Sequence, residues 1–269
     1  MNTLTNPNPI GIFDSGVGGV SVLKEIRNLS NTEDLIYFAD SAHCPYGFKS
    51  PEEIRSRIIK ITRFMLEHKA KLIVAACNTA SIAGLDFLRK IFNVPIVGME
   101  PAIKPAAALT QNGKVGVLAT GVTISGDRFN SLLERYANGI EVFRVACPGL
   151  VEQVEQGLIN EPETIAMLKV FLKPLIDAGV DTIVLGCTHY PFLRHQVEAI
   201  AGPSVQVIDT GNAVARRVVQ VLSEENLLND VSTPKGQEQF YTSGEPEHVG
   251  KVIAKLWGDN SVKVKKMKL

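Results

Sequence analysis

The sequence predicts an α/β fold of two similar units, each with a mainly parallel sheet flanked by helices, and an active site at their interface. Short apolar runs alternate with amphipathic segments, a pattern typical of parallel sheets. The order of these runs repeats once, at offsets of 105 to 111 residues. In each copy one run ends in a cysteine followed by small polar residues, at Cys77 and Cys187. A chain of 269 residues can hold two such units, which we place at residues 1–99 with 209–269 and at residues 100–208.

The first copy contains four predicted strands and three predicted helices. The predicted strands are Ile10–Phe13, Leu35–Asp40, Ile73–Ala76 and Val94–Gly98. The predicted helices are Val20–Leu29, Pro51 to about His68, and Ala80–Phe92. The start of the second helix is the clearest signal. Ser50 caps it, Pro51 takes its first turn and Glu53 completes a capping box. Its predicted core face consists of Ile54, Ile58, Ile61 and Met65.

The second copy repeats the four strands, and a tail then departs from the repeat. The matching runs are Lys114–Gly121, Ile140–Phe143, Ile183–Leu185 and Val205–Asp209. The tail predicts a helix at Ala213–Ser223, a strand at Gln239–Thr242 and a helix at Val249–Trp257, all packed back on the first unit. We interpret the basic segment Ser261–Lys268 as a solvated or frayed end rather than a binding arm.

Composition and charge favour a small-molecule ligand and argue against nucleic acid or membrane as a partner. Basic and acidic side chains balance at 28 each, so no net field attracts either. No apolar run approaches the roughly 20 residues of a membrane span, and Met1–Pro9 lacks the features of a signal peptide. We therefore expect a cytoplasmic protein. Four widely spaced cysteines without a C-x-x-C pair predict reduced thiols, and five scattered histidines predict no metal site.

A glycine-rich turn, Gly16–Gly19, follows the first strand and precedes a helix. Glycines allow close backbone approach, and amides at a helix start attract anions. Neither the Walker pattern nor G-x-G-x-x-G is present. A ligand carboxylate is therefore the expected anion, in preference to a phosphate.

The two strand-end cysteines suggest proton transfer at a carbon. A lone cysteine at such a position is more often an inert small hydrophobe. Two of them in matching units, Cys77 and Cys187, fit removal of a proton from one face of a carbon and its return to the other. A free thiol is mostly protonated at neutral pH, so each needs a helper.

Asp14, His189 and Glu155 are the candidate helpers of the two thiols. Each also has a structural interpretation: a turn residue, a neutral hydrogen-bonded histidine and a surface helix carboxylate, respectively. Glu152 lies one helical turn from Glu155 and could take its place. The uncharged donors and acceptors expected at the same edge suit the carboxylate and ammonium groups of an amino acid; they are Ser15, Asn78, Thr79 and Thr188. Cys44 and Cys147 lack matched partners, and we interpret them as bystanders.

Five segments together resemble the glutamate racemases. They are Gly11–Gly19, Pro45–Gly47, Ala76–Ser81, Gly98–Pro101 and Leu185–Pro191. The resemblance runs from Ile10 to about Gly244 and implies two α/β units with the site between them. It further implies cofactor-independent racemisation of glutamate, supplying D-glutamate for peptidoglycan, in a protein that is often a homodimer. One departure is His43-Cys44 before Pro45, where a residue such as Arg is expected.

The same resemblance implies roles for individual residues. Cys77 would deprotonate one enantiomer with help from Asp14, whereas Cys187 would deprotonate the other with help from Glu155 and His189. The residues that would hold the substrate are Asp14, Ser15, Pro45, Tyr46, Gly47, Asn78, Thr79, Thr188 and His189.

Two alternatives stay open at this stage. One is another two-cysteine racemase of the same superfamily, acting on aspartate or a hydantoin. The other is a two-domain protein that closes on an amino acid without reacting, although binding alone needs neither thiol.

Overall fold

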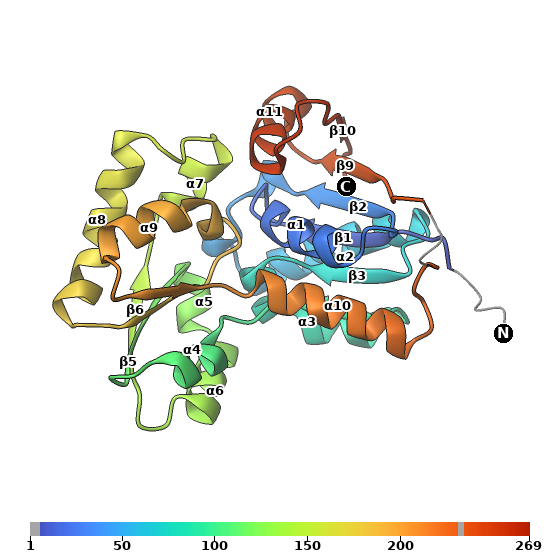
Figure 1. Cartoon of the computed structure of the whole chain (residues 1–269). Helices are drawn as coiled ribbons and strands as arrows, with labels where there is room; N and C mark the ends of the chain where they lie inside the picture. Colours follow the sequence, from blue (N-terminus) through green and yellow to red (C-terminus); the bar gives the residue numbers. More distant parts are fainter. Residues whose placement is uncertain (1–5, 231–233) are drawn as a thin grey trace.

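The computed structural model describes residues 6–230 and 234–269, which form two parallel sheets side by side with helices on both faces (Figure 1). The six-stranded sheet has the order β10 (Val264–Lys266), β9 (Glu238–Thr242), β2 (Leu35–Ala39), β1 (Ile10–Asp14), β3 (Leu72–Ala75), β4 (Ile96–Gly98). The four-stranded sheet has the order β6 (Glu141–Ala146), β5 (Lys114–Ala119), β7 (Thr182–Leu185), β8 (Gln206–Ile208). The predicted fold class is confirmed.

The two sheets share one topology, as the repeat in the sequence predicts. The order β2-β1-β3-β4 in the larger sheet corresponds to β6-β5-β7-β8 in the smaller one. The registers correspond as well: Ile10 pairs with Leu72 in the first sheet, and Val115 pairs with Thr182 in the second. All four strands of the smaller sheet lie between residues 114 and 208. The domain boundaries at 99/100 and 208/209 stay a prediction.

Helices cover both faces of the larger sheet. The helices α1 (Val20–Leu29), α10 (Gly211–Glu224) and α11 (Pro246–Trp257) share a core with one face, and α2 (Pro51–Glu67) and α3 (Asn78–Ile91) share a core with the other. Successive strand residues alternate between the faces. Ile12 therefore lies in the first core and Phe13 in the second. Such double burial explains why the strands are continuous apolar runs.

The predicted capping box of α2 is present. The Ser50 hydroxyl accepts a hydrogen bond from the Glu53 amide, and the Glu53 carboxylate accepts one from the Ser50 amide. A cap of this kind stabilises a helix by about 1 kcal/mol. The predicted apolar positions, from Ile54 to Met65, are all buried.

The smaller sheet is covered in the same way. The helices α4 (Ile103–Leu109) and α6 (Asp127–Tyr136) pack on one face. The other face packs against α7 (Leu150–Glu155), α8 (Pro162–Asp177) and α9 (Arg194–Ala201). Short helical turns follow several strands at their carboxyl ends: η1 (Ser41–His43), η2 (Tyr46–Phe48), α5 (Gly121–Ser125) and η3 (Tyr190–Leu193).

The tail returns to the larger sheet, as predicted. β9 pairs in parallel with β2, and α10 packs against α1. Ser261–Lys268 is not the frayed end that was one interpretation of the sequence, because β10 within it pairs with β9, although most of its side chains are solvated as expected. Val264 packs against one core and Met267 against the other. The lysines of this segment face solvent, and charged side chains on an edge strand disfavour pairing with another chain.

A buried carboxylate positions the loop that contains Pro45–Gly47. Asp40, fully buried at the end of β2, accepts hydrogen bonds from the Tyr46 hydroxyl at 2.6 Å and from Ser243 at 2.7 Å. Arg57 of α2 donates two more, at 2.9 and 2.8 Å. Removing one partner of such a pair leaves an uncompensated buried charge. The loop is therefore held firmly over the carboxyl edge of the sheet.

Across residues 6–230 and 234–269, none of the helices is both long enough and apolar enough to span a bilayer.

Candidate active site

A small cavity lies where the carboxyl ends of the two sheets meet, and both strand-end thiols line it. Cys77 follows β3 of the larger sheet, and Cys187 follows β7 of the smaller one. The full lining consists of Ser15, Pro45, Tyr46, Gly47, Cys77, Asn78, Thr79, Thr120, Val151, Gly186, Cys187, Thr188 and His189. The structure thus gathers every predicted substrate-binding residue except Asp14 around one space. Asp14 touches its wall through Thr188.

Cys77 is the N-cap of α3. Its sulfur accepts a hydrogen bond from the Ala80 amide at 3.4 Å and lies 3.8 Å from the Ser15 hydroxyl. The helix begins at Asn78, two residues before the predicted start. Asn78 and Thr79 therefore belong to the first turn, whose amide groups lack partners within the helix. This cap places the thiol and the positive end of the helix at the cavity together.

The resting state of Cys77 is the thiol. Burial raises its pKa, and the negative charge of Asp14 raises it further. The hydrogen bonds of the Cys77 sulfur with the Ala80 amide and the Ser15 hydroxyl oppose this only in part. Cys77 therefore carries a proton at rest, and it needs help to lose that proton before it can act as a base.

Asp14 joins the two units beneath the cavity. Its Oδ2 atom accepts hydrogen bonds from the Gly19 amide at 3.0 Å and the Gly16 amide at 3.3 Å. Its Oδ1 atom accepts one from the Thr188 hydroxyl at 3.3 Å. Burial raises the pKa of Asp14, whereas the charge of His189 and the two glycine amides lower it.

The glycine-rich turn binds carboxylates of the protein itself. Asp14 takes the amides of Gly16 and Gly19, and Glu155 takes the amide of Val17 at 2.5 Å. The expectation that this turn holds a ligand carboxylate is therefore wrong for these amides. A Cβ atom at Gly16 would lie 2.0 Å from the Glu155 carboxylate, and one at Gly18 would lie 2.3 Å from the His189 ring. These two glycines make room for the side chains of Glu155 and His189.

Three groups form a chain that ends at Cys187. The Cys187 sulfur lies 3.7 Å from Nδ1 of His189. Nε2 of His189 donates to Oε1 of Glu155 at 2.7 Å, and the Ser41 hydroxyl donates to Oε2 at 3.2 Å. It is thus Glu155, rather than Glu152, that contacts the histidine.

The charge state of His189 follows from these contacts. Burial alone would lower its pKa, but hydrogen bonds with Cys187, Cys44 and Glu155 outweigh burial and raise the pKa well above its usual value. A protonated His189 next to Cys187 stabilises a thiolate there.

Asn78 points to a missing ligand. Both polar atoms of its side-chain amide are buried without a hydrogen-bond partner in the described part of the chain, and the residue lines the cavity. Buried polar groups are rarely left unpaired. The Thr79 hydroxyl, by contrast, already bonds Thr120 and Thr123 across the two units. Asn78 is thus the side chain best prepared to bind substrate.

Sequence reasoning missed Thr120, which lines the cavity at the end of β5. It stands 105 residues after Ser15, the offset of the first strand pair, so the repeat contained a signal for it. Cys44, interpreted from the sequence as a bystander, lies close to the site as well. It lies near Glu155 and His189, and burial is the main reason that its pKa rises to about 12. No spacing in the sequence connects this loop residue to either partner.

Cys147 lies beside the site without lining the cavity between the thiols. Its sulfur is 3.5 Å from the carbonyl oxygen of Val145, and burial is the main cause of its pKa of about 12. This position agrees with the bystander interpretation.

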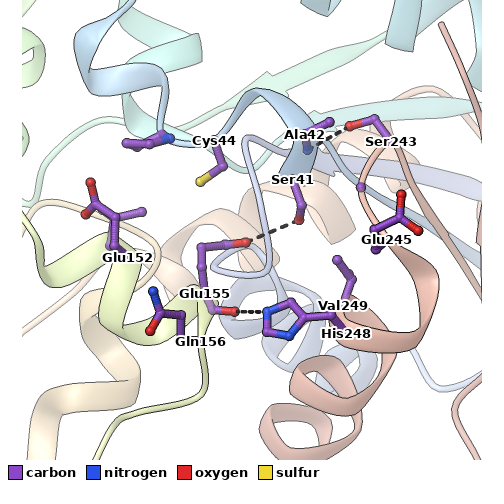
Figure 2. Close-up of a pocket in the computed structure, with 13 residues that line it drawn as sticks. Ser41, Ala42, Cys44, Glu152, Glu155, Gln156, Ser243, Glu245, His248 and Val249 are labelled. Atoms are coloured by element: carbon purple, nitrogen blue, oxygen red, sulfur yellow. Dashed lines mark hydrogen bonds between the residues drawn. The ribbon is translucent and has the colours of Figure 1, made fainter.

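A larger cavity of about 490 Å³ opens beside the thiol cavity, between α7, α11 and the loop that contains Cys44. Figure 2 shows Cys44 and Glu155 facing this space, with His248 donating to the main-chain oxygen of Glu155. The thiol cavity itself measures only about 10 Å³, room for about one water molecule. An amino acid is larger than this space, so the cavity has to open before one can enter.

The fold and the site together define a class of protein. Two similar α/β units that each place one thiol at a shared cavity form an enzyme site that contacts a small molecule from two sides.

Comparisons with known proteins agree with this class. The profile of the Asp/Glu/hydantoin racemase family matches residues 10–218. The chain is 49% identical to a glutamate racemase of Roseiflexus sp. (strain RS-1) over 249 residues, 92% of each chain. It is 50% identical to that of Herpetosiphon aurantiacus, covering 91% of this chain and 96% of the relative. The crystal structure of Escherichia coli glutamate racemase with L-glutamate superposes with a TM-score of 0.84, at 34% identity, over 97% of this chain and 98% of that one. The chain belongs to the Asp/Glu/hydantoin racemase family and is an isomerase.

Proposed function

We propose that this protein interconverts L- and D-glutamate without a cofactor, using Cys77 and Cys187 as the two acid-base groups. The observation that carries the proposal is that one thiol from each unit lines the same cavity. The names of its relatives support glutamate as the substrate, and the E. coli relative binds L-glutamate. The unpaired amide of Asn78 supplies a donor and an acceptor for the carboxylate and ammonium groups.

The proposed reaction moves two protons in opposite senses. In one direction the thiolate of Cys77 removes the α-proton, and the thiol of Cys187 donates a proton to the opposite face of the carbon. The products are the inverted amino acid, a Cys77 thiol and a Cys187 thiolate. The reverse reaction exchanges these roles, so each direction needs both sulfurs in opposite protonation states.

Neighbouring side chains would assist proton transfer by each of the two thiols. Asp14 is the carboxylate that we propose as the helper of Cys77, and its negative charge is one of the causes that raise the pKa of that thiol. Protonated His189, held by Glu155, would stabilise the Cys187 thiolate at 3.7 Å. The thiols on the two faces of the substrate would thus be assisted by different side chains.

The sequence resemblance extends the proposal to the cell. We infer that the protein supplies D-glutamate for peptidoglycan in the cytoplasm and works as a homodimer. Expression of the chain in a bacterium that depends on added D-glutamate is expected to remove that dependence. Growth that still requires D-glutamate, with the protein present and folded, would contradict the role.

Isotope exchange tests the reaction directly. Incubated with L-glutamate in heavy water, the purified protein is expected to replace the α-proton by deuterium without any added cofactor, because the donating thiol carries a solvent-derived deuteron. Loss of the α-proton signal in the NMR spectrum measures this. An unchanged signal would indicate a protein that only binds the amino acid.

The same measurement separates the substrates. L-aspartate and a hydantoin, offered under identical conditions, are expected to exchange far more slowly than L-glutamate. Faster exchange of either would assign the chain to another branch of the family.

A further inference from the structure

We propose that Cys44, Glu155 and His189 form a binding site for one thiophilic divalent cation, with Zn²⁺ as the best fit, and that occupancy inhibits the enzyme. The ligand atoms of these side chains all lie within 4.8 Å of one another. Inhibition rests on the proposed function, because Glu155 and His189 are the groups that would assist Cys187. Binding of the cation does not depend on it.

The donor set matches zinc. Thiolate, imidazole and carboxylate are the three ligand types that zinc takes in proteins, at bond lengths of about 2.0–2.3 Å. A tetrahedral ion with these bonds separates its ligand atoms by about 3.5 Å. Nε2 of His189 and Oε1 of Glu155, now 2.7 Å apart, would have to move apart modestly.

The three ligands come from three separate segments, which explains why the sequence showed no metal pattern. Cys44 follows η1, Glu155 ends α7 and His189 follows β7. Cys44 follows a strand of the larger sheet and His189 follows a strand of the smaller one. The ion would therefore link the two units. The expectation of no metal site rested on the absence of a metal-ligand spacing along the chain, and the three residues of this site do not form such a spacing either.

The surroundings favour an ion in two ways. Cys44 and Glu155 line the cavity of about 490 Å³, which gives access from solvent and leaves room for a water as the fourth ligand (Figure 2). Outer contacts orient the ligands, as metal sites require. Ser41 and the Val17 amide hold the Glu155 carboxylate, and Cys187 lies beside Nδ1 of His189.

The net charge of the site is the same with and without the bound ion. Without metal, the Glu155 carboxylate and the protonated His189 sum to zero. With Zn²⁺ bound, the Cys44 thiolate and the Glu155 carboxylate balance the ion, while neutral His189 coordinates it. One proton from the thiol and one from the imidazolium leave for solvent. A buried site that stays neutral avoids the cost of an uncompensated charge.

Occupancy would stop catalysis for a structural reason. The ion takes the lone pair of His189 and the carboxylate of Glu155, so neither can assist Cys187. It also links the loop before Pro45 to the smaller sheet, which opposes the opening that substrate entry requires.

Cobalt binding and zinc inhibition test the proposal on the whole purified protein after removal of metals with a chelator. Wild-type protein is expected to bind one Co²⁺ per chain with a thiolate-to-cobalt absorption band in the near ultraviolet. Zn²⁺ is expected to inhibit racemisation reversibly, with activity restored by the chelator. In Cys44→Ala the band should disappear and the zinc inhibition constant should rise by about tenfold or more, because one of three protein ligands is gone.

Cys147→Ala is the matched control, since it removes a buried cysteine beside the site and should keep both the band and the inhibition. A band of wild-type strength in Cys44→Ala would place the metal on another cysteine and overturn the proposal. Absence of any thiolate band in wild-type protein would overturn it as well. The absorption band needs no turnover, so it distinguishes failure of this site from failure of the proposed racemase reaction.

Discussion

Replacing either strand-end sulfur by oxygen, as Cys77→Ser or Cys187→Ser, is expected to lower glutamate racemisation by about 10²–10⁴-fold in both directions. A hydroxyl of similar size remains in the cavity, but it ionises far less readily than a thiol and so is a poor proton acceptor. Both directions fall together because each uses one sulfur as base and the other as acid. Circular dichroism starting from L- and from D-glutamate measures the two rates.

The two serine variants should differ in isotope exchange. With Cys187 replaced, the surviving base Cys77 faces one side of the α-carbon, so exchange in heavy water is expected only for the enantiomer whose proton points to it. Cys77→Ser should show the opposite preference. Exchange of the same enantiomer by both variants would contradict a site with one base on each face.

Cys147→Ser is the control for general effects of losing a buried thiol beside the site. It should racemise like the wild type, because Cys147 does not line the cavity between Cys77 and Cys187. Normal turnover by Cys187→Ser would refute the acid-base assignment.

The change Glu155→Gln is expected to lower kcat by about 10²-fold and to shift the pH profile. The amide can still accept the hydrogen bond from Val17, but it no longer supplies the negative charge beside His189. The pKa of His189 therefore falls. If the active form needs protonated His189, its activity is present below that pKa and lost above it, so the alkaline decline moves to lower pH.

Rate measurements across the pH range, with folding monitored in parallel, test this. Glu152→Gln removes a carboxylate one helical turn earlier on α7 and serves as the matched control. It should leave the profile in place, because Glu152 does not contact His189. A shift in Glu152→Gln alone would assign the assisting role to the other carboxylate.

Much of this site could be predicted from strand periodicity and the internal repeat. Both place Cys77 and Cys187 at equivalent strand ends, and parallel sheets gather such ends at one edge. The same reasoning brings Ser15, Asn78 and Thr188 to the cavity. The structure confirms all five positions, while their roles stay predictions.

Other features depended on contacts between distant segments. The position of Cys44 arises only when its loop packs against α7 and the His189 turn. The use of the glycine-rich turn by Asp14 and Glu155 joins residues up to 138 positions apart. Residue spacing along the chain contains no signal for such long-range contacts, because loop geometry and packing between the units determine them.

The strand order of the larger sheet affects how the chain emerges during synthesis. All strands of the smaller sheet are translated before β9, whereas β2 must wait for β9 to cover its outer edge. Until then the ribosome-bound chain presents an apolar strand, Leu35–Ala39, with unpaired backbone groups. Growing chains therefore expose an unpaired, aggregation-prone strand edge for most of translation. In this period a chaperone would have its greatest effect on the yield of folded protein.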